Sequence, residues 1–295
     1  MAMKPDISAI TNPLVTSTQL LHFKSSSIVS TPSSHFATFL LTQAAGIFLR
    51  LPQETIATAI VLLQRYLISS ASSPIATSTT NGIESTKPNP ELAHLSAAAL
   101  YLSAKLSSIP TSPRNLINVY AFLTSQTSSP LPFISPSART SATTTSPPDP
   151  SSHYVSEGAL ERHRLLLFQL ESRLLISLAF NTNVSLPHPL ALTYLTLLFP
   201  NQQHTELTTR VLSHLNTALL SPNGQYLYLT HQPTALAVAA IYLAARELQV
   251  KIPVGECNWW EVFDVGREEL GFCVVGMLAG TEATLPEAGS LGAFR

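Results

Sequence analysis

A short segment occurs twice in this chain, and the repeat restricts the possible folds more than any other feature. The first copy, residues 98–105, reads Ala-Ala-Leu-Tyr-Leu-Ser-Ala-Lys, and the second copy, residues 239–246, reads Ala-Ala-Ile-Tyr-Leu-Ala-Ala-Arg. Each copy is a run of small and apolar residues that ends on one cation. This pattern is typical of a central helix that is packed on most sides and reaches the surface in its last turn. The repeat therefore predicts two related helical domains in tandem.

The composition provides enough apolar material for two cores. The chain has 295 residues, of which 45% are hydrophobic and only 11% are charged, and its formal net charge is −1. Such a charge gives no general attraction to nucleic acid or to an anionic membrane, so direct nucleic-acid binding is not expected. The longest apolar run, Ala235 to Ala245, is about half of the roughly 20 residues that span a bilayer. No membrane segment is expected.

The sequence carries no motif of a catalytic or metal site. There are two cysteines, Cys257 and Cys273, and nine histidines, without a CxxC pair or a spacing that suits a metal. A Gly-rich phosphate loop, HExxH and GxSxG are also absent. We therefore predict no catalytic residue, no metal and no cofactor.

Helical periods dominate both halves of the chain. In the first half, helices are expected at 33–50, from Pro52 onwards, at 91–107, from Pro113 onwards and at 157–178. In the second half they are expected at 188–199, 203–220, 233–249 and 266–279, with a short one around 259–263. Each half thus holds about five helices, and the repeated segment belongs to the third. The predicted fold class is all-α.

Two stretches rich in Ser, Thr and Pro, at about 69–90 and 124–156, predict disordered insertions. The expected organisation is an N-terminal extension at 1–32, a first domain at 33–182 containing both insertions, a second domain at 183–281 and a C-terminal tail at 282–295.

Five helices with the third at the centre are the arrangement of the cyclin box, and several motifs carry the same resemblance. The chain is similar to transcriptional cyclins, and most closely to the cyclin L group. The motifs span roughly residues 12–280, and they are Asn12-Pro13-Leu14-Val15-Thr16, Ala45 through Gln53, Pro113 through Tyr120, and Gln232 through Leu248.

The resemblance implies a regulatory subunit and not an enzyme. Cyclins of this group form a heterodimer with a cyclin-dependent protein kinase and push its mobile helix into the active position. The expected setting is the nucleus, in RNA polymerase II transcription or RNA processing.

The resemblance also implies a kinase-binding site. The family's lysine late in the third helix and its glutamate in the fifth fall on Lys105 and Glu171, with apolar contacts from Leu106 and Leu175. Independently of the family, Lys105 is the only cation in the apolar repeat helix, and a half-buried lysine needs a partner. We expect the two charged side chains to meet in the folded domain.

Structural interpretations stand beside these functional ones. Lys105 could simply extend into solvent at a helix end, where a cation also suits the helix dipole. Its repeat counterpart Arg246 is expected to serve packing, as are Trp259 and Trp260. His163 and His231 are expected to be surface or capping residues and not metal ligands.

The chain also departs from the cyclin L pattern. An acidic pair normally follows the lysine, whereas here Lys105 is followed by Leu-Ser-Ser, and there is no arginine–serine-rich tail. A splicing role is therefore open. Two alternatives remain: a TFIIB-type factor that binds DNA through two cyclin folds, and a helical scaffold without a kinase partner.

Overall fold

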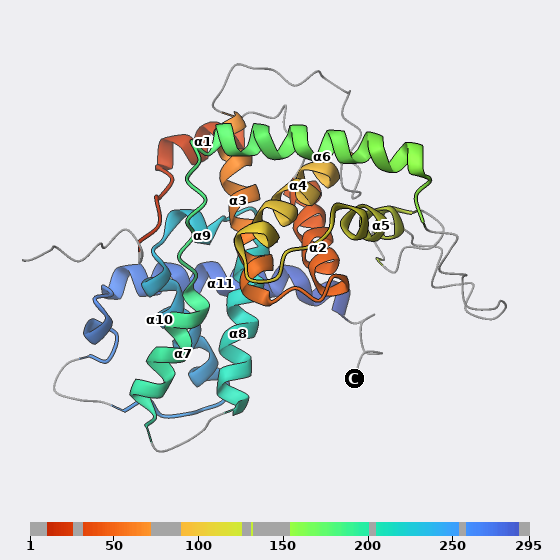
Figure 1. Cartoon of the computed structure of the whole chain (residues 1–295). Helices are drawn as coiled ribbons and strands as arrows, with labels where there is room; N and C mark the ends of the chain where they lie inside the picture. Colours follow the sequence, from red (N-terminus) through yellow and green to blue (C-terminus); the bar gives the residue numbers. More distant parts are fainter. Residues whose placement is uncertain are drawn as a thin grey trace, which may run out of the picture. The chain divides into compact units, whose positions relative to one another are not determined.

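The structure is a computed structural model that describes residues 11–25, 32–71, 90–125, 131, 154–200, 205–253 and 258–288. Every regular element in these ranges is a helix (Figure 1), which confirms the predicted all-α class. The two predicted insertions lie outside the described residues except at their ends and at residue 131, and Cys257 lies outside them as well. No helix in the described part has both the length and the apolar character needed to cross a bilayer.

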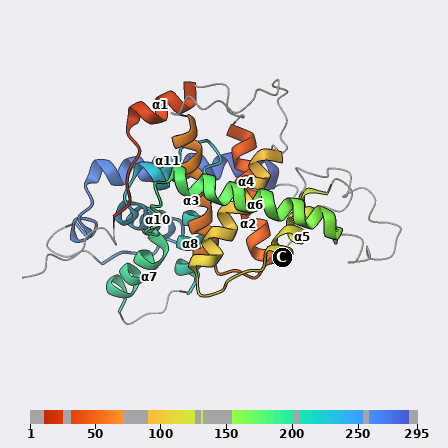
Figure 2. The same cartoon turned by 45° about the horizontal axis from the view of Figure 1, so that its top comes forward.

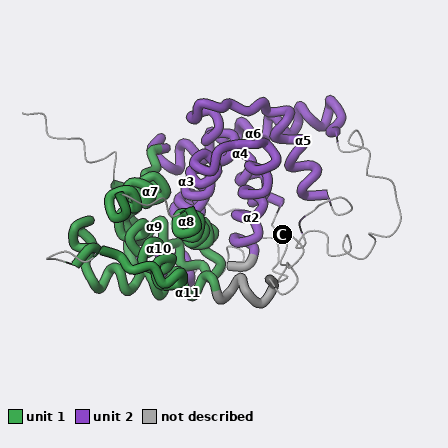
Figure 3. Tube along the Cα trace, turned by 90° about the horizontal axis from the view of Figure 1, so that it is seen from below, with its two compact units in different colours: residues 1–17, 183–295 green, residues 18–182 purple. Residues whose placement is uncertain are grey.

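The chain divides into two compact units (Figure 3). Residues 18–182 form one of them, which we call the N-terminal unit. Residues 183–295 form the other together with the first 17 residues, and we call it the C-terminal unit. The sequence pattern assigns those first residues to an extension instead. The boundaries of two cyclin boxes stay a prediction.

The N-terminal unit is built around the helix that contains the first repeat copy. This helix, α4, packs against α2, α3, α5 and α6, and Figure 2 shows the same helices from a second direction. Ala98, Ala99 and Leu100 have no exposed surface. The small side chains of the two alanines let the surrounding helices approach closely. The helices of the unit are α1 (Ser17–Ser25), α2 (Pro32–Phe48), α3 (Gln53–Ala71), α4 (Pro90–Leu106), α5 (Pro113–Thr124) and α6 (Glu157–Ser177).

Proline marks the beginning of several of these helices, because it lacks the N–H that a first turn leaves unpaired anyway. At α5, Pro113 follows the N-cap residue Ser112, whose hydroxyl accepts a hydrogen bond from the backbone N–H of Asn115 at 3.2 Å. A proline also marks the first residue of α4, which begins at Pro90.

The second repeat copy has the corresponding position in the C-terminal unit. Its helix, α10, packs against α7, α8, α9 and α11, and Ala239, Ala240 and Ile241 are fully buried. Trp259 is buried too and meets Trp260 edge to face at 5.9 Å, as expected for packing aromatics. The helices are α7 (Pro187–Leu198), α8 (Thr205–Leu220), α9 (Leu227–Thr230), α10 (Pro233–Glu247), the 3₁₀ helix η4 (Glu261–Phe263) and α11 (Arg267–Ala288).

Three helical features differ from the expectation. Helix α1 forms within the region predicted as an extension, and the four-residue α9 was not predicted. Helix α11 runs to Ala288, past the predicted end at 279.

An N-terminal segment is tied into the C-terminal unit by reciprocal hydrogen bonds. The side-chain amide of Asn12 donates to the carbonyl oxygen of Ser185 at 2.7 Å, and the N–H of Ser185 donates back to Asn12 Oδ1 at 2.8 Å. The backbone of Asn12 likewise donates to Gln232 Oε1 at 3.1 Å and accepts from Gln232 Nε2 at 3.2 Å. Residues from two of the sequence motifs therefore meet although 220 positions separate them.

Candidate functional site

Lys105 and Glu171 form an ion pair between the last turn of α4 and the C-terminal half of α6. The lysine side chain is 43% exposed, whereas the glutamate side chain is only 9% exposed. A nearly buried carboxylate is costly without an opposite charge, so Lys105 stabilises Glu171 in this position. The structure thus brings together the two charged residues that the sequence expected to meet.

The lysine also lies against an aromatic ring. Its Nζ is 4.9 Å from the ring centroid of Tyr101, one helical turn earlier on α4. The ring of Tyr101 meets that of Phe168 on α6 with centroids 6.1 Å apart, and the guanidinium of Arg164 lies 5.6 Å above Phe168. We call these four residues the cation–ring ladder: Lys105, Tyr101, Phe168 and Arg164.

Paired residues run along the whole contact between α4 and α6. His94 faces His163 at one end, with ring centroids 5.9 Å apart, and Lys105 faces Glu171 at the other. Because the residue numbers rise together on both helices, α4 and α6 run in the same direction.

The two residues predicted to make apolar contacts beside the ion pair differ in their exposure to solvent. Leu106, the residue after the lysine, has 59% of its surface exposed, and Leu175, one turn after Glu171, is half-buried. Helix α6 ends at Ser177, and a turn follows. In this turn Phe180 is 69% exposed and its backbone has a positive φ of 60°. Exposed apolar side chains thus lie at the end of α4 and just after the end of α6.

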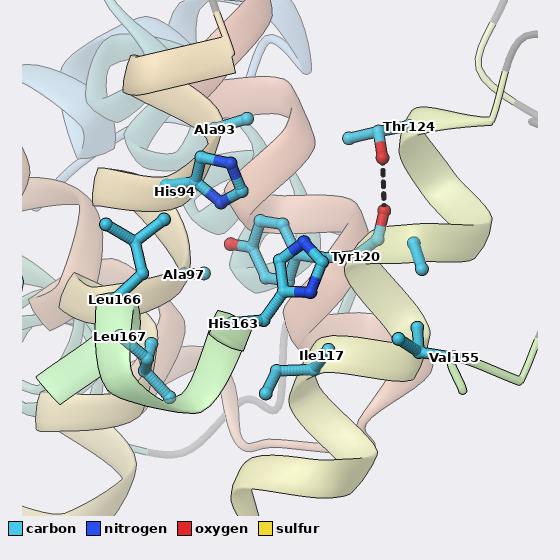
Figure 4. A pocket seen from close by; sticks show the side chains of 11 residues that line it. Ala93, His94, Ala97, Ile117, Tyr120, Thr124, Val155, His163, Leu166 and Leu167 are labelled. Carbon is cyan, nitrogen blue, oxygen red and sulfur yellow. Dashed lines mark hydrogen bonds between the residues drawn. The ribbon is translucent and has the colours of Figure 1, made fainter. Parts of the chain in front are cut away.

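A small cavity of about 90 Å³ lies at the other end of the α4–α6 contact. Figure 4 shows the imidazoles of His94 and His163 on its wall, beside Tyr120. His163 Nδ1 donates to the carbonyl of Ala159 at 2.7 Å, and the Tyr120 hydroxyl pairs with Ser96 at 2.6 Å. The remaining lining residues are apolar or small, apart from Thr124.

The electrostatics of this cavity favour the neutral form of the His94 imidazole. Burial lowers the pKa of His94, and the neighbouring charge of His163 lowers it further. Within the described residues, no group of three or more His, Cys, Asp or Glu side chains could hold a metal ion.

The C-terminal unit has ion pairs at the end of its repeat helix, but with different partners. Arg246, the counterpart of Lys105, is exposed, which is at odds with the expected packing role. The next residue, Glu247, pairs with Arg210 of α8 and lies 3.2 Å from Nε2 of the buried His214. Burial works to raise the pKa of the Glu247 carboxyl, but the hydrogen bond and charge of Arg210, with those of His214, outweigh it and leave this pKa below its ordinary value.

Sequence reasoning missed the cation–ring ladder, the cavity and the Glu247 pairs. The spacing Tyr101-x-x-x-Lys105 could have predicted the contact between these two residues, because residues four apart lie on one helix face. The contacts to α6 depend on the alignment of two helices that lie far apart in sequence, which no local pattern specifies.

Curated proteins similar to this chain are cyclins of the L type. The chain is 27% identical to cyclin-L2 of Mus musculus over 232 residues, covering 78% of the chain and 37% of that protein. It is 28% identical to cyclin-L1 of Gallus gallus over 232 residues and to cyclin-L1 of Homo sapiens over 230 residues, covering 78% of the chain and 36% of each relative. The chain thus spans little more than a third of the length of these relatives. No family model matches it.

Solved structures with a similar fold come from protein complexes. One is a chain of the yeast RNA polymerase II CTD kinase CTDK-1 complex, with a TM-score of 0.62, 14% identity and coverage of 92% of this chain and 73% of that one. Another is a chain of the CAK complex of Chaetomium thermophilum bound to ATP-gamma-S, with a TM-score of 0.52, 14% identity and coverage of 93% and 76%. At this identity the likeness shows the fold.

Proposed function

We propose that this cyclin-L-like chain is a non-catalytic regulatory subunit that binds and activates a cyclin-dependent protein kinase. The observation that carries the proposal is the ion pair of Lys105 and Glu171, in a chain whose relatives over 78% of its length are cyclins. The fold, which is shared with a chain of an RNA polymerase II CTD kinase complex, supports it.

The geometry of the pair suits recognition of a kinase backbone. A lysine ammonium has three N–H donors, and Glu171 occupies one side of this one while 43% of the lysine side chain stays exposed. The remaining donors can reach carbonyl oxygens of a partner, and the carboxylate of Glu171 can accept from a backbone N–H. Leu106 and Leu175 would add apolar contact around the polar centre.

Binding at this site would activate the kinase by positioning its mobile helix. Phosphoryl transfer by protein kinases requires a lysine–glutamate pair and correctly placed metal ions, and the position of that helix controls the pair. The cyclin would stabilise the active arrangement through its docked surface and would supply no catalytic group.

The proposed setting is the nucleus, where the kinase would act in RNA polymerase II transcription. The likeness to a chain of CTDK-1, an RNA polymerase II CTD kinase complex, supports this setting. A role in RNA processing, which the resemblance to the cyclin L group implies, is the alternative within the same class.

Charge-reversal variants test the proposal. The tagged chain should recover a cyclin-dependent kinase from cells of the organism that produces it. Lys105→Glu or Glu171→Lys should lower the amount of kinase recovered at least tenfold. Each reversal places two like charges together and removes the contact to the kinase backbone. Circular dichroism melting should establish that each variant is folded before its binding is scored.

The repeat supplies a matched control for this experiment. Arg246→Glu reverses an exposed cation at the corresponding position of the second copy and should leave kinase recovery unchanged. If wild-type chain recovers no kinase, or if folded Lys105→Glu binds as well as wild type, the proposed function is wrong. Binding to duplex DNA at low salt, abolished as salt rises, would instead favour the TFIIB-type alternative.

A further inference from the structure

The ammonium of Lys105 is held by two neighbours of different chemistry. Glu171 attracts it by charge. The ring of Tyr101 lies 4.9 Å away, within the range of about 6 Å in which an aromatic face attracts a cation. A lysine side chain that is 43% exposed would otherwise sample several rotamers.

The ring that faces the lysine is itself fixed. Tyr101 has 8% of its surface exposed and is part of the buried core of the N-terminal unit. Phe168 of α6 packs against it at 6.1 Å with a tilt of 38°. Because this contact joins two helices, the orientation of the ring depends on the packing of α4 against α6.

We propose that Tyr101, supported by Phe168, is a positioning residue that orients Lys105 for the kinase. This inference rests on the proposed function and deepens it. A pre-oriented ammonium loses less rotamer freedom when it binds, so the ring contributes to affinity without touching the partner.

The second repeat copy shows that the sequence spacing alone does not build this arrangement. Tyr242 and Arg246 have the same spacing as Tyr101 and Lys105. Within the described residues, the cations that lie over rings are Lys105 and Arg164, both in the N-terminal unit. Tyr242 is therefore a matched control position for Tyr101.

The ring, and not the hydroxyl, is the active part of Tyr101 in this proposal. Phenylalanine keeps the ring face, whereas leucine removes it and keeps an apolar side chain. Tyr101→Phe should therefore bind the kinase as wild type does, and Tyr101→Leu should bind about three- to tenfold more weakly. Tyr242→Leu should leave the affinity unchanged.

The probe is the recombinant form of the kinase identified by the affinity purification described above, titrated against the full-length chain by calorimetry. A double-mutant cycle with Lys105→Met separates positioning from simple packing. In the Lys105→Met background, Tyr101→Leu should cause no further loss, because no ammonium is left to orient. Melting curves should show that every variant is folded at the titration temperature.

Three results would overturn the proposal. Tyr101→Leu could bind as wild type; it could weaken binding equally with and without Lys105; or Tyr101→Phe could lose as much affinity as Tyr101→Leu, which would assign the effect to the hydroxyl. In each case a strong loss with Lys105→Glu would leave the proposed function intact. If Lys105→Glu also bound as wild type, the proposed function would fail together with the positioning role.

Discussion

His35 on α2 is a residue whose charge the protein interior suppresses. It has 4% of its surface exposed, and the ring of Phe23 from α1 stacks on it with centroids 5.7 Å apart. Burial lowers the pKa of this imidazole from 6.5 to about 4. At a pH between these two pKa values, His35 is therefore neutral in the folded unit and protonated in the unfolded chain.

This difference makes the N-terminal unit less stable in mild acid. Between pH 7.5 and pH 5, His35 alone should lower the free energy of unfolding by roughly 2 kcal/mol, since the unfolded state binds more protons as the pH falls below 6.5. The loss should continue until the pH nears 4. Urea unfolding of wild type and His35→Leu at pH 7.5, 6 and 5 measures it.

The useful quantity is the difference between the two pH slopes, because the other histidines contribute equally to both proteins. His35→Leu should show the shallower slope. Equal slopes would mean that His35 takes up its proton as readily in the folded unit as in the unfolded chain.

For single residues, the sequence predicted that Lys105 and Glu171 would meet, but it did not predict the contacts that hold the lysine in place. The lysine could be singled out because it is the one cation in an apolar helix, and the resemblance named its partner. The contact between Tyr101 and Phe168 depends on which residues of α4 and α6 face each other. That alignment results from the packing of the whole unit.

Helices α2 and α3 approach each other closely at Gly46. A Cβ atom on Gly46 would lie 2.5 Å from Cγ1 of Ile56, whose side chain is almost completely buried. A glycine near the end of α2 therefore allows α3 to begin directly against it. Gly46 belongs to a motif that the sequence analysis used for the resemblance, and this contact gives the motif a structural cause.

Gly46→Ala should accordingly destabilise the N-terminal unit by about 1–3 kcal/mol, because Ile56 must move within a packed core. Gly158→Ala on α6 is the matched control, since nothing lies within 4 Å of the added Cβ. It should be neutral or stabilising by up to about 1 kcal/mol. Chemical denaturation of both variants provides the measurement, and equal stabilities would show that α2 and α3 adjust freely.

Helix boundaries were predictable where proline or a long apolar period marked them. Helices α4, α5, α7 and α10 each begin at a proline. Helix α1 has Phe23 as its single buried residue, and α9 is four residues long, so neither carries a periodic signal. Their positions depend on what they pack against.

For the whole molecule, the two units defined by contacts do not follow the order of the chain. Asn12 is buried and belongs to the unit that otherwise begins at Asn183. The sequence suggested two consecutive domains because the repeat copies follow one another. It could not show that an early segment joins the later unit, since hydrogen bonds between Asn12, Ser185 and Gln232 leave no periodic pattern.

Asn12→Ala should weaken the C-terminal unit selectively. The variant leaves the partly buried N–H of Ser185 without its acceptor, at a cost of about 1–3 kcal/mol. Hydrogen exchange followed by mass spectrometry should show faster exchange in peptides covering 183–186 and 227–232. Exchange in α4 should not change.

Asn223→Ala is the control, because the Asn223 amide donates to the carbonyl of Ala279 at an exposed site of the same unit. It should leave the exchange of both peptides as in wild type. Faster exchange throughout the chain with Asn12→Ala would contradict a local role for Asn12.

The bonds of Asn12 also have a consequence for synthesis on the ribosome. Asn12 is made early, but its partner Gln232 follows 220 residues later, which at roughly 5–20 residues per second is a delay of about 10–40 seconds. All of residues 18–182 are made within that interval. The hydrogen bonds of Asn12 to Ser185 and Gln232 can therefore form only after the residues that carry Lys105 and Glu171 have all been made, so this part of the C-terminal unit is completed late in synthesis.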